Sequence, residues 1–149
     1  MAVRVDENLC SAGFRPTRQR RAVFEALAAA GPCHPTAEEV FTSVRAVMPH
    51  ISLATVYKAL ESLAAAGLAQ KFGCGQGSAR FDARTDEHYH AVCRRCGAVH
   101  DVEPVPAASR ALRALGLPLA RVDDVRVQFI GECHSCRGKQ PPAAPTLDH

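Results

Sequence analysis

Apolar residues in the first half of the chain recur every three or four positions, the spacing of a helix that buries one face. The first of these stretches predicts a helix over residues 17–30. A second helix follows a capping box, in which Thr36 and Glu39 satisfy each other's free backbone donors. A third begins after Ser52 and ends at Gly67. The pattern therefore predicts three amphipathic helices in close succession.

Beyond the third helix the helical spacing gives way to short strands. Residues 68–82 contain two of them, LAQKF and SARFD, joined by a glycine-rich turn at 73–77. Three helices followed by such a hairpin indicate a winged helix-turn-helix. Many proteins with this architecture bind DNA, but winged helices also serve as protein-interaction modules.

After residue 84 the pattern changes again. Strands are predicted at 88–92 and 98–103, a helix from about 105 to 115, and a further strand at 122–131. The mixture of strands and one helix indicates a small α/β unit that follows the winged helix.

The predicted fold class is therefore α+β, with a winged helix-turn-helix domain at residues 1–84 and a small α/β domain at 85–137. A length of 149 residues, of which 47% are hydrophobic and 22% charged, fits one domain or two small ones. Residues 138–149 are rich in proline and poor in apolar side chains, so we expect a disordered tail.

The formal net charge of +3 is too small to identify a nucleic-acid binder by itself. The distribution of charge is more informative, because four arginines fall within seven positions near the N-terminus: Arg15, Arg18, Arg20 and Arg21. Such a cluster is more often a solvated helix face than a binding surface. It becomes a candidate phosphate-binding surface only in combination with the third predicted helix.

The exposed face of the third helix has the composition of a recognition helix. It opens with Ala54, Thr55, Tyr57 and Lys58, which are small, hydroxyl-bearing, aromatic and cationic. These side chains suit a helix whose N-terminal half enters a major groove and meets phosphates and base edges. The candidate DNA-binding residues are Arg15, Arg18, Arg20, Ser52, Ala54, Thr55, Tyr57 and Lys58.

Two cysteine pairs of the form Cys-x-x-Cys, Cys93 with Cys96 and Cys133 with Cys136, predict a four-thiolate structural zinc site. The alternatives are two disulfides or four ordinary buried cysteines. Disulfides need an oxidising compartment, and the chain opens without a long apolar secretory or membrane segment. We therefore expect a reduced, cytoplasmic protein. The α/β unit is small, so zinc and a partner subunit are expected to supply part of its stability.

A second metal site is suggested by histidines and carboxylates close to the first cysteine pair. His88 and His90 alternate on a predicted strand and so face the same way, with Asp82 and Asp101 nearby in sequence. Imidazole and carboxylate ligands suit iron(II), manganese(II), nickel or zinc. A pair of solvated or hydrogen-bonded strand histidines is the competing interpretation.

The segments ISLATVYKALESLAAAGLAQK, HYHAVCRRCG and GECHSC, in this order, resemble the ferric uptake regulator (Fur) family of metal-dependent bacterial repressors. The resemblance covers about residues 6–137. It implies a winged-helix domain joined to a dimerisation domain that holds a four-cysteine zinc, and a regulatory metal that bridges the two. It also implies a homodimer on an inverted-repeat operator of double-stranded DNA, with one recognition helix per half-site.

Within this family, the chain is most similar to the peroxide-sensing (PerR) branch. The regulatory ligands of that branch correspond to His34, Asp82, His88, His90 and Asp101. Asp101 distinguishes the peroxide-sensing branch from the iron-responsive members, which typically carry glutamate at this position. The resemblance implies Fe²⁺ or Mn²⁺ as the regulatory metal, and oxidation of His34 or His88 when the iron form meets peroxide. The alternative is a regulator of iron, manganese, zinc or nickel uptake without peroxide sensing.

Some positions depart from the pattern of the family. The stretch 122–125 reads VDDV where many relatives have a histidine pair, which argues against a third metal site. Glu87 replaces a further imidazole of the zinc- and nickel-responsive relatives. Of the remaining cysteines, Cys10 is expected to be buried in a first helix, Cys74 to be exposed at the wing tip, and Cys33 to lie beside a ligand.

An enzymatic role is not expected. A zinc hydrolase needs an open coordination position beside a general base, and the chain lacks the HExxH helix and the deaminase signature that supply them. Peroxide is the only small molecule expected to react with the protein, and no membrane partner is expected.

Overall fold

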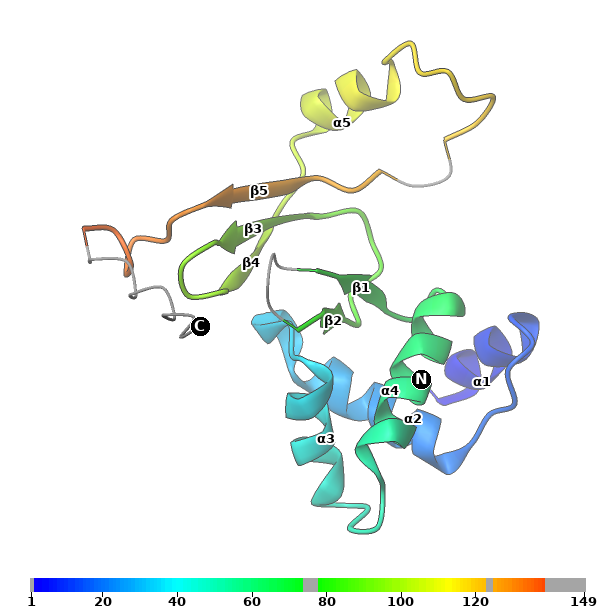
Figure 1. Ribbon diagram of the computed structural model, residues 1–149. Coiled ribbons are helices and arrows are strands. Elements are labelled where there is room, and N and C mark those ends of the chain that lie inside the picture. The colour runs from blue at the N-terminus through cyan, green and yellow to red at the C-terminus, as the bar shows by residue number, and fades with distance from the viewer. Residues whose placement is uncertain (1, 74–77, 123–124, 139–149) are drawn as a thin grey trace, which may run out of the picture. The chain divides into compact units, whose positions relative to one another are not determined.

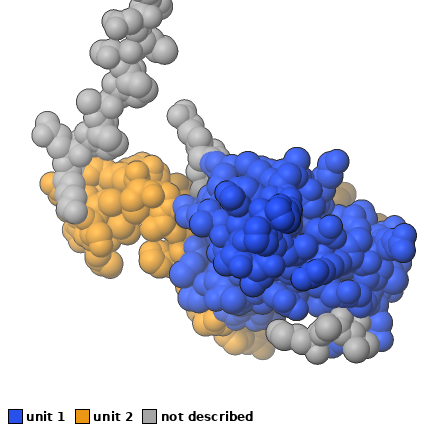
Figure 2. All heavy atoms as spheres, turned by 90° about the horizontal axis from the view of Figure 1, so that it is seen from below, with its two compact units in different colours: residues 1–88 blue, residues 89–149 orange. Residues whose placement is uncertain are grey.

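The computed structural model describes residues 2–73, 78–122 and 125–138, and these residues fall into two compact units. The first unit ends at His88 and the second begins at Tyr89 (Figure 2). The boundary expected from the sequence lies just before this point, between residues 84 and 85. The glycine-rich turn at 74–77 and the tail from 139 on lie outside the described residues.

Four α-helices and a short 3-10 helix form most of the first unit (Figure 1). All three helices expected from the apolar spacing are present, and each begins at the expected cap. The hydroxyls of Thr17, Thr36 and Ser52 accept hydrogen bonds from backbone N–H groups in the first turns that follow them. The bounds are Ala2–Ser11 for α1, Arg18–Ala29 for α2, Gly31–Cys33 for the 3-10 helix, Ala37–Arg45 for α3 and Leu53–Ala65 for α4.

The apolar faces of these helices meet in one core. Val23 and Leu27 of α2 pack with Val40 and Val44 of α3, and α1 adds two further side chains, including Leu9. α4 contributes the fully buried side chains of Val56, Leu60 and Leu63, and the wing contributes that of Phe81. The predicted apolar stripes are therefore core, and they orient α3 and α4 as a helix-turn-helix.

The capping box at the start of α3 offers a direct test of the helix assignment. Thr36 Oγ1 accepts from the Glu39 N–H at 3.3 Å, and Glu39 Oε2 accepts from the Thr36 N–H at 2.8 Å. Thr36→Ala is expected to lower the free energy of unfolding by about 1 kcal/mol in urea denaturation, because the helix loses an N-terminal acceptor. Thr42→Ala, an exposed site on the same helix, is the control. An equal loss in both variants would contradict the capping role.

The wing consists of two antiparallel strands, β1 at Gln70–Phe72 and β2 at Arg80–Asp82. Both are shorter than the strands expected from the sequence. β2 also lies against the segment before α3, because the Phe81 N–H donates to the Pro35 carbonyl at 2.9 Å. The wing is therefore attached directly to the helix-turn-helix at this point.

The second unit is a three-stranded sheet with one helix, α5 at Pro106–Arg113. β3 at Tyr89–Cys93 is the central strand; β4 at Val99–Val102 pairs with it in antiparallel fashion and β5 at Gln128–Gly131 in parallel fashion. Both α5 and β5 are shorter than expected. The residues described between 121 and 127 are not in a strand, so the strand expected to begin at 122 begins at 128. No helix within the described ranges has the length and apolar content to cross a membrane.

Candidate metal and DNA-binding sites

The four cysteines of the two Cys-x-x-Cys pairs lie together in the second unit. Cys93 ends β3, and its register partner in β5 is Gly131, so the turns after these two parallel strands meet at one end of the sheet. As a result, the sulfur atoms of the four cysteines all lie within 4.8 Å of one another: Cys93, Cys96, Cys133 and Cys136. Topology alone thus brings together two motifs that are far apart in sequence.

The spacing of the sulfurs fits zinc and not a disulfide. Cys96 Sγ and Cys133 Sγ are 3.8 Å apart, whereas a disulfide needs about 2.05 Å. A tetrahedral site with zinc–sulfur bonds of about 2.3 Å separates its sulfurs by about 3.8 Å. The four-cysteine cluster therefore fits a structural zinc ion, as the spacing predicted.

Hydrogen bonds within the cluster shift the pKa values of two of its cysteines in opposite directions. Hydrogen bonds from the backbone N–H groups of Cys133 and Cys96 lower the pKa of Cys93 to about 6. Hydrogen bonding to the neighbouring Cys133 and Cys96 sulfurs raises the pKa of Cys136 to about 12. Several thiolates at this spacing repel one another, and a divalent cation is the group that relieves this repulsion.

In the first unit, His34, Asp82 and His88 form a buried cluster. Asp82 Oδ2 lies 3.5 Å from His34 Nε2 and 2.9 Å from His88 Nε2. All three residues are buried: Asp82 is 4% exposed, His34 0% and His88 6%. His88 Nδ1 lies 2.8 Å from the Asp86 carbonyl oxygen, so Nε2 is the nitrogen directed at Asp82. A backbone contact of this kind fixes the ring orientation of metal-binding histidines.

Asp82 is held as a carboxylate. Burial raises its pKa, but hydrogen bonds from His34, from the Arg84 backbone N–H and from His88 outweigh this effect and bring the pKa below its ordinary value. A buried carboxylate between two imidazoles is a donor set suited to a borderline or hard divalent cation. The three residues therefore fit a metal of the type that the sequence suggested.

His90 and Asp101 form a second pair, within the second unit. They are register partners on β3 and β4, and His90 Nε2 lies 3.8 Å from Asp101 Oδ1. His90 is buried and Asp101 is half-buried. The pair offers one nitrogen and one carboxylate, and it is joined to the first cluster in sequence, since Tyr89 alone separates His88 from His90.

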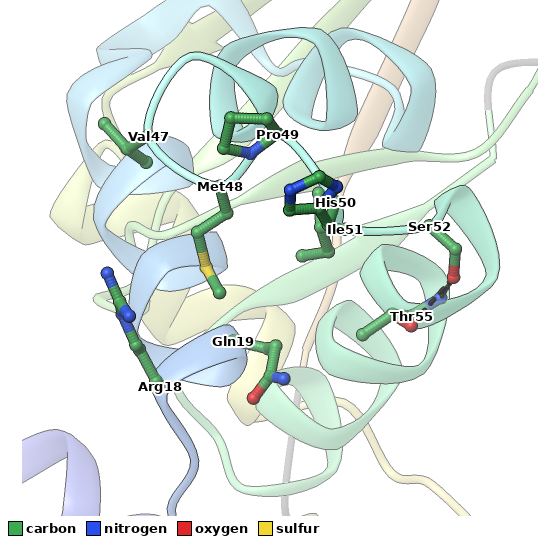
Figure 3. A pocket seen from close by; sticks show the side chains of 9 residues that line it. All are labelled: Arg18, Gln19, Val47, Met48, Pro49, His50, Ile51, Ser52 and Thr55. Carbon is green, nitrogen blue, oxygen red and sulfur yellow. Dashed lines mark hydrogen bonds between the residues drawn. The ribbon is translucent and has the colours of Figure 1, made fainter.

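A hollow of about 350 Å³ lies at the start of α4 in the first unit. Figure 3 shows the three predicted residues Arg18, Ser52 and Thr55 around it, so α2 and α4 contribute to one surface. Gln19 and His50 also line it, and neither is among the DNA-binding residues predicted from the sequence. Gln19 directly follows Arg18 and His50 lies two residues before Ser52, and this closeness in sequence could have indicated that both line the same surface.

The remaining candidate DNA-binding residues differ in their surroundings. Ala54, Tyr57 and Lys58 are exposed on α4. The Tyr57 hydroxyl donates to Glu38 Oε1 at 2.7 Å, and this hydrogen bond raises the pKa of Tyr57. Arg15 is exposed as well.

Two arginines of the N-terminal cluster make internal contacts. Arg20 Nη1 donates to the Arg15 carbonyl at 2.6 Å, and its guanidinium lies over the Phe14 ring at 5.6 Å from the centroid. Arg21 makes two hydrogen bonds to the Asp6 carboxylate, at 2.7 and 2.8 Å, which join α2 to α1. Arg15 and Arg18 are the two fully exposed members of the cluster.

One expectation about the other cysteines is wrong. Cys10 lies in α1 as expected, but it is exposed, because the α1 face that packs on the core is formed by Val5 and Leu9. Cys33 is exposed beside His34, and Cys74 lies outside the described residues.

Comparison with known proteins agrees with this architecture. The sequence profile of the Ferric uptake regulator family matches residues 11–121. The chain is 33% identical to the Peroxide operon regulator of Bacillus subtilis (strain 168), over 90% of this chain and 92% of that protein. It is 34% identical to the Ferric uptake regulation protein of the same organism, over 92% of this chain and 95% of that protein.

Solved structures give the same result. The ferric uptake regulator from Pseudomonas aeruginosa with manganese superposes with a TM-score of 0.72 at 25% identity, covering 87% of this chain and 98% of that one. The Campylobacter jejuni peroxide stress regulator superposes with a TM-score of 0.66 at 28% identity, covering 79% and 88%. The chain therefore belongs to the ferric uptake regulator family, whose members are metal-responsive transcriptional regulators and not enzymes.

Proposed function

We propose that this protein is a metal-dependent repressor that senses peroxide through iron-catalysed oxidation of a histidine ligand. The observation that carries this proposal is the set of three buried imidazoles and two aspartates, in particular the half-buried aspartate at position 101. Aspartate there resembles the peroxide-sensing branch, and the Peroxide operon regulator is among the similar proteins. The slightly higher identity to a Ferric uptake regulation protein supports the alternative, a metal-uptake regulator without peroxide sensing.

In this proposal one Fe²⁺ or Mn²⁺ ion is bound by His34, Asp82, His88, His90 and Asp101. The donor set contains three nitrogens and two carboxylates, which suits either cation and leaves room for a further ligand. Iron(II), when bound, would catalyse the oxidation of a neighbouring imidazole by hydrogen peroxide, in which one peroxide oxygen is added to a ring carbon and the other leaves as water. Oxidised His34 or His88 is a poor donor, so the chain no longer retains the metal.

The distribution of the ligands explains how metal would control DNA binding. His34, Asp82 and His88 belong to the first unit, and His90 and Asp101 belong to the second. An ion held by all five would fix the two units relative to one another, in the arrangement that suits the operator. Loss of one ligand would release this constraint.

Operator recognition is assigned to the exposed face of α4. Ala54, Thr55, Tyr57 and Lys58 meet base edges and phosphates in a major groove, with Ser52 at the helix N-terminus. Arg15 and Arg18 contact phosphates beside the hollow at the start of α4. Arg20, which donates to the Arg15 carbonyl, holds the segment that carries Arg15.

The exposed apolar side chains of the second unit support the proposal of a homodimer. β5 lies at one edge of the three-stranded sheet, and both Phe129 and Ile130 are more than half exposed. Val105, just before α5, is exposed as well, and so are three leucines that follow the helix: Leu115, Leu117 and Leu119. We propose that a second copy of the unit packs against these side chains. The resulting dimer would bind an inverted repeat of operator DNA in the cytoplasm.

The proposal is tested by binding of an operator fragment to protein loaded anaerobically with Fe²⁺ or Mn²⁺, before and after micromolar peroxide. We expect both metal forms to bind DNA and only the iron form to lose binding, with one added oxygen on the peptide that contains His34 or His88. Peptide mass spectrometry identifies the modified residue. Binding that survives peroxide with both metals would favour the metal-uptake alternative.

A further inference from the structure

Arg80, in the wing strand β2, contacts the backbone of the proposed ligand His34. Its Nη1 donates to the His34 carbonyl oxygen at 2.8 Å, across 46 residues of sequence. The same nitrogen lies 3.6 Å from Glu39 Oε2, the carboxylate of the capping box. The Arg80 side chain is 22% exposed, so most of it is removed from solvent.

The backbone that Arg80 contacts is in an unusual conformation. His34 has φ 45° and ψ 68°, and among the described residues it is the one non-glycine residue with a positive φ. This left-handed conformation is unfavourable for a side chain with a Cβ, and it persists where surrounding contacts impose it. The His34 side chain is fully buried, as expected if the conformation serves to aim the imidazole inward.

β2 holds His34 through both its backbone and its side chain. Arg80 and Asp82 are two residues apart on the strand and face the same way. Arg80 binds the His34 carbonyl, and Asp82 Oδ2 lies 3.5 Å from His34 Nε2. Between them, the Phe81 N–H donates to the Pro35 carbonyl, so the turn containing His34 is attached to three consecutive residues of the wing.

We propose that Arg80 is a positioning residue for the regulatory metal site: it fixes His34 in the left-handed conformation that presents the imidazole to Asp82. This inference rests on the proposed function only in that His34 is a metal ligand. It assigns to an arginine of the wing a role in metal affinity.

The test is Mn²⁺ affinity of the full-length, zinc-loaded protein in the absence of DNA, measured by electron paramagnetic resonance of free Mn²⁺. Co²⁺ absorption reports the ligand geometry. We expect Arg80→Ala to weaken Mn²⁺ binding by on the order of 10-fold, the usual loss for removal of an outer-shell contact, and to change the Co²⁺ spectrum. Arg80→Lys keeps a charged donor but not the planar fork, and an intermediate loss is expected.

Lys71→Ala is the matched control, because it removes a positive charge from the adjacent wing strand without touching His34. Its Mn²⁺ affinity and Co²⁺ spectrum should equal those of the wild type. Wild-type affinity in both Arg80 variants would overturn the inference and leave the proposed function intact. A wild-type protein with no Mn²⁺ or Co²⁺ site besides the cysteines would overturn both. If Arg80→Ala does not fold, the Arg80→Lys variant decides by the same criteria.

Discussion

Replacing Cys136 by serine is expected to unfold the second unit and leave the protein monomeric. The apolar side chains that the described part of this unit buries are those of Tyr89, Val92, Cys93 and Val99, and α5 buries none of its side chains. Such a core is too small to hold three strands, whereas structural zinc contributes about 10–16 kcal/mol in small zinc-dependent domains. We therefore expect bound zinc to supply most of the stability of this unit.

This loss is measured by zinc content, by light scattering for oligomeric state, and by hydrogen exchange of the β3 and β5 amides. Cys10→Ser is the matched control, because Cys10 is exposed on α1 and belongs to the other unit. It should keep zinc and exchange protection. A stable dimer of the Cys136→Ser variant without zinc would show that packing, and not the metal, maintains the sheet.

His90→Ala is expected to give a folded, zinc-containing dimer that no longer binds operator DNA in response to Fe²⁺ or Mn²⁺. His90 lies on the central strand and pairs in register with Asp101, so its replacement deletes one proposed nitrogen ligand and its contact with Asp101. Loss of a direct ligand should weaken metal binding more than the 10–100-fold that is typical of outer-shell partners. Metal-dependent shift of an operator fragment is the measurement.

His100→Ala provides the control for this prediction. His100 neighbours Asp101 on β4 but is exposed, so its loss changes the same strand without removing a proposed ligand. Operator binding by His100→Ala should match the wild type. Metal-dependent binding that persists in His90→Ala would remove His90 from the proposed ligand set and leave Asp101 as the one proposed ligand from the second unit.

Local sequence signals were sufficient to predict the helix starts and the cysteine cluster. Thr17, Thr36 and Ser52 each precede an apolar stripe, and a side-chain acceptor at that point acts within one turn, so no tertiary information is needed. The Cys-x-x-Cys spacing is also local. It predicted the zinc ligands before the sheet topology showed how the two pairs meet.

Features that depend on tertiary contacts could not be predicted. The left-handed backbone of His34 carries no local signature, because the residue is not glycine and the Arg80 contact that supports it comes from a distant strand. The internal contacts of Arg20 were not predicted either, because its hydrogen bond to the Arg15 carbonyl and its place over Phe14 depend on the turn before α2. The length of β5 was overestimated because Val122, Val125 and Val127 have a high β-propensity, whereas the strand begins only at Gln128.

The parallel pairing of β3 with β5 has a consequence for protein synthesis. The two cysteine pairs are 37 residues apart, measured between Cys96 and Cys133. The helix-turn-helix can fold on the ribosome as soon as β2 has emerged, since its core is complete at Phe81. The cysteine cluster, in contrast, cannot form until Cys136 has emerged as well. A nascent chain therefore passes through a stage at which the helix-turn-helix is folded and the four cysteines have not yet met, and we expect zinc capture to follow that stage.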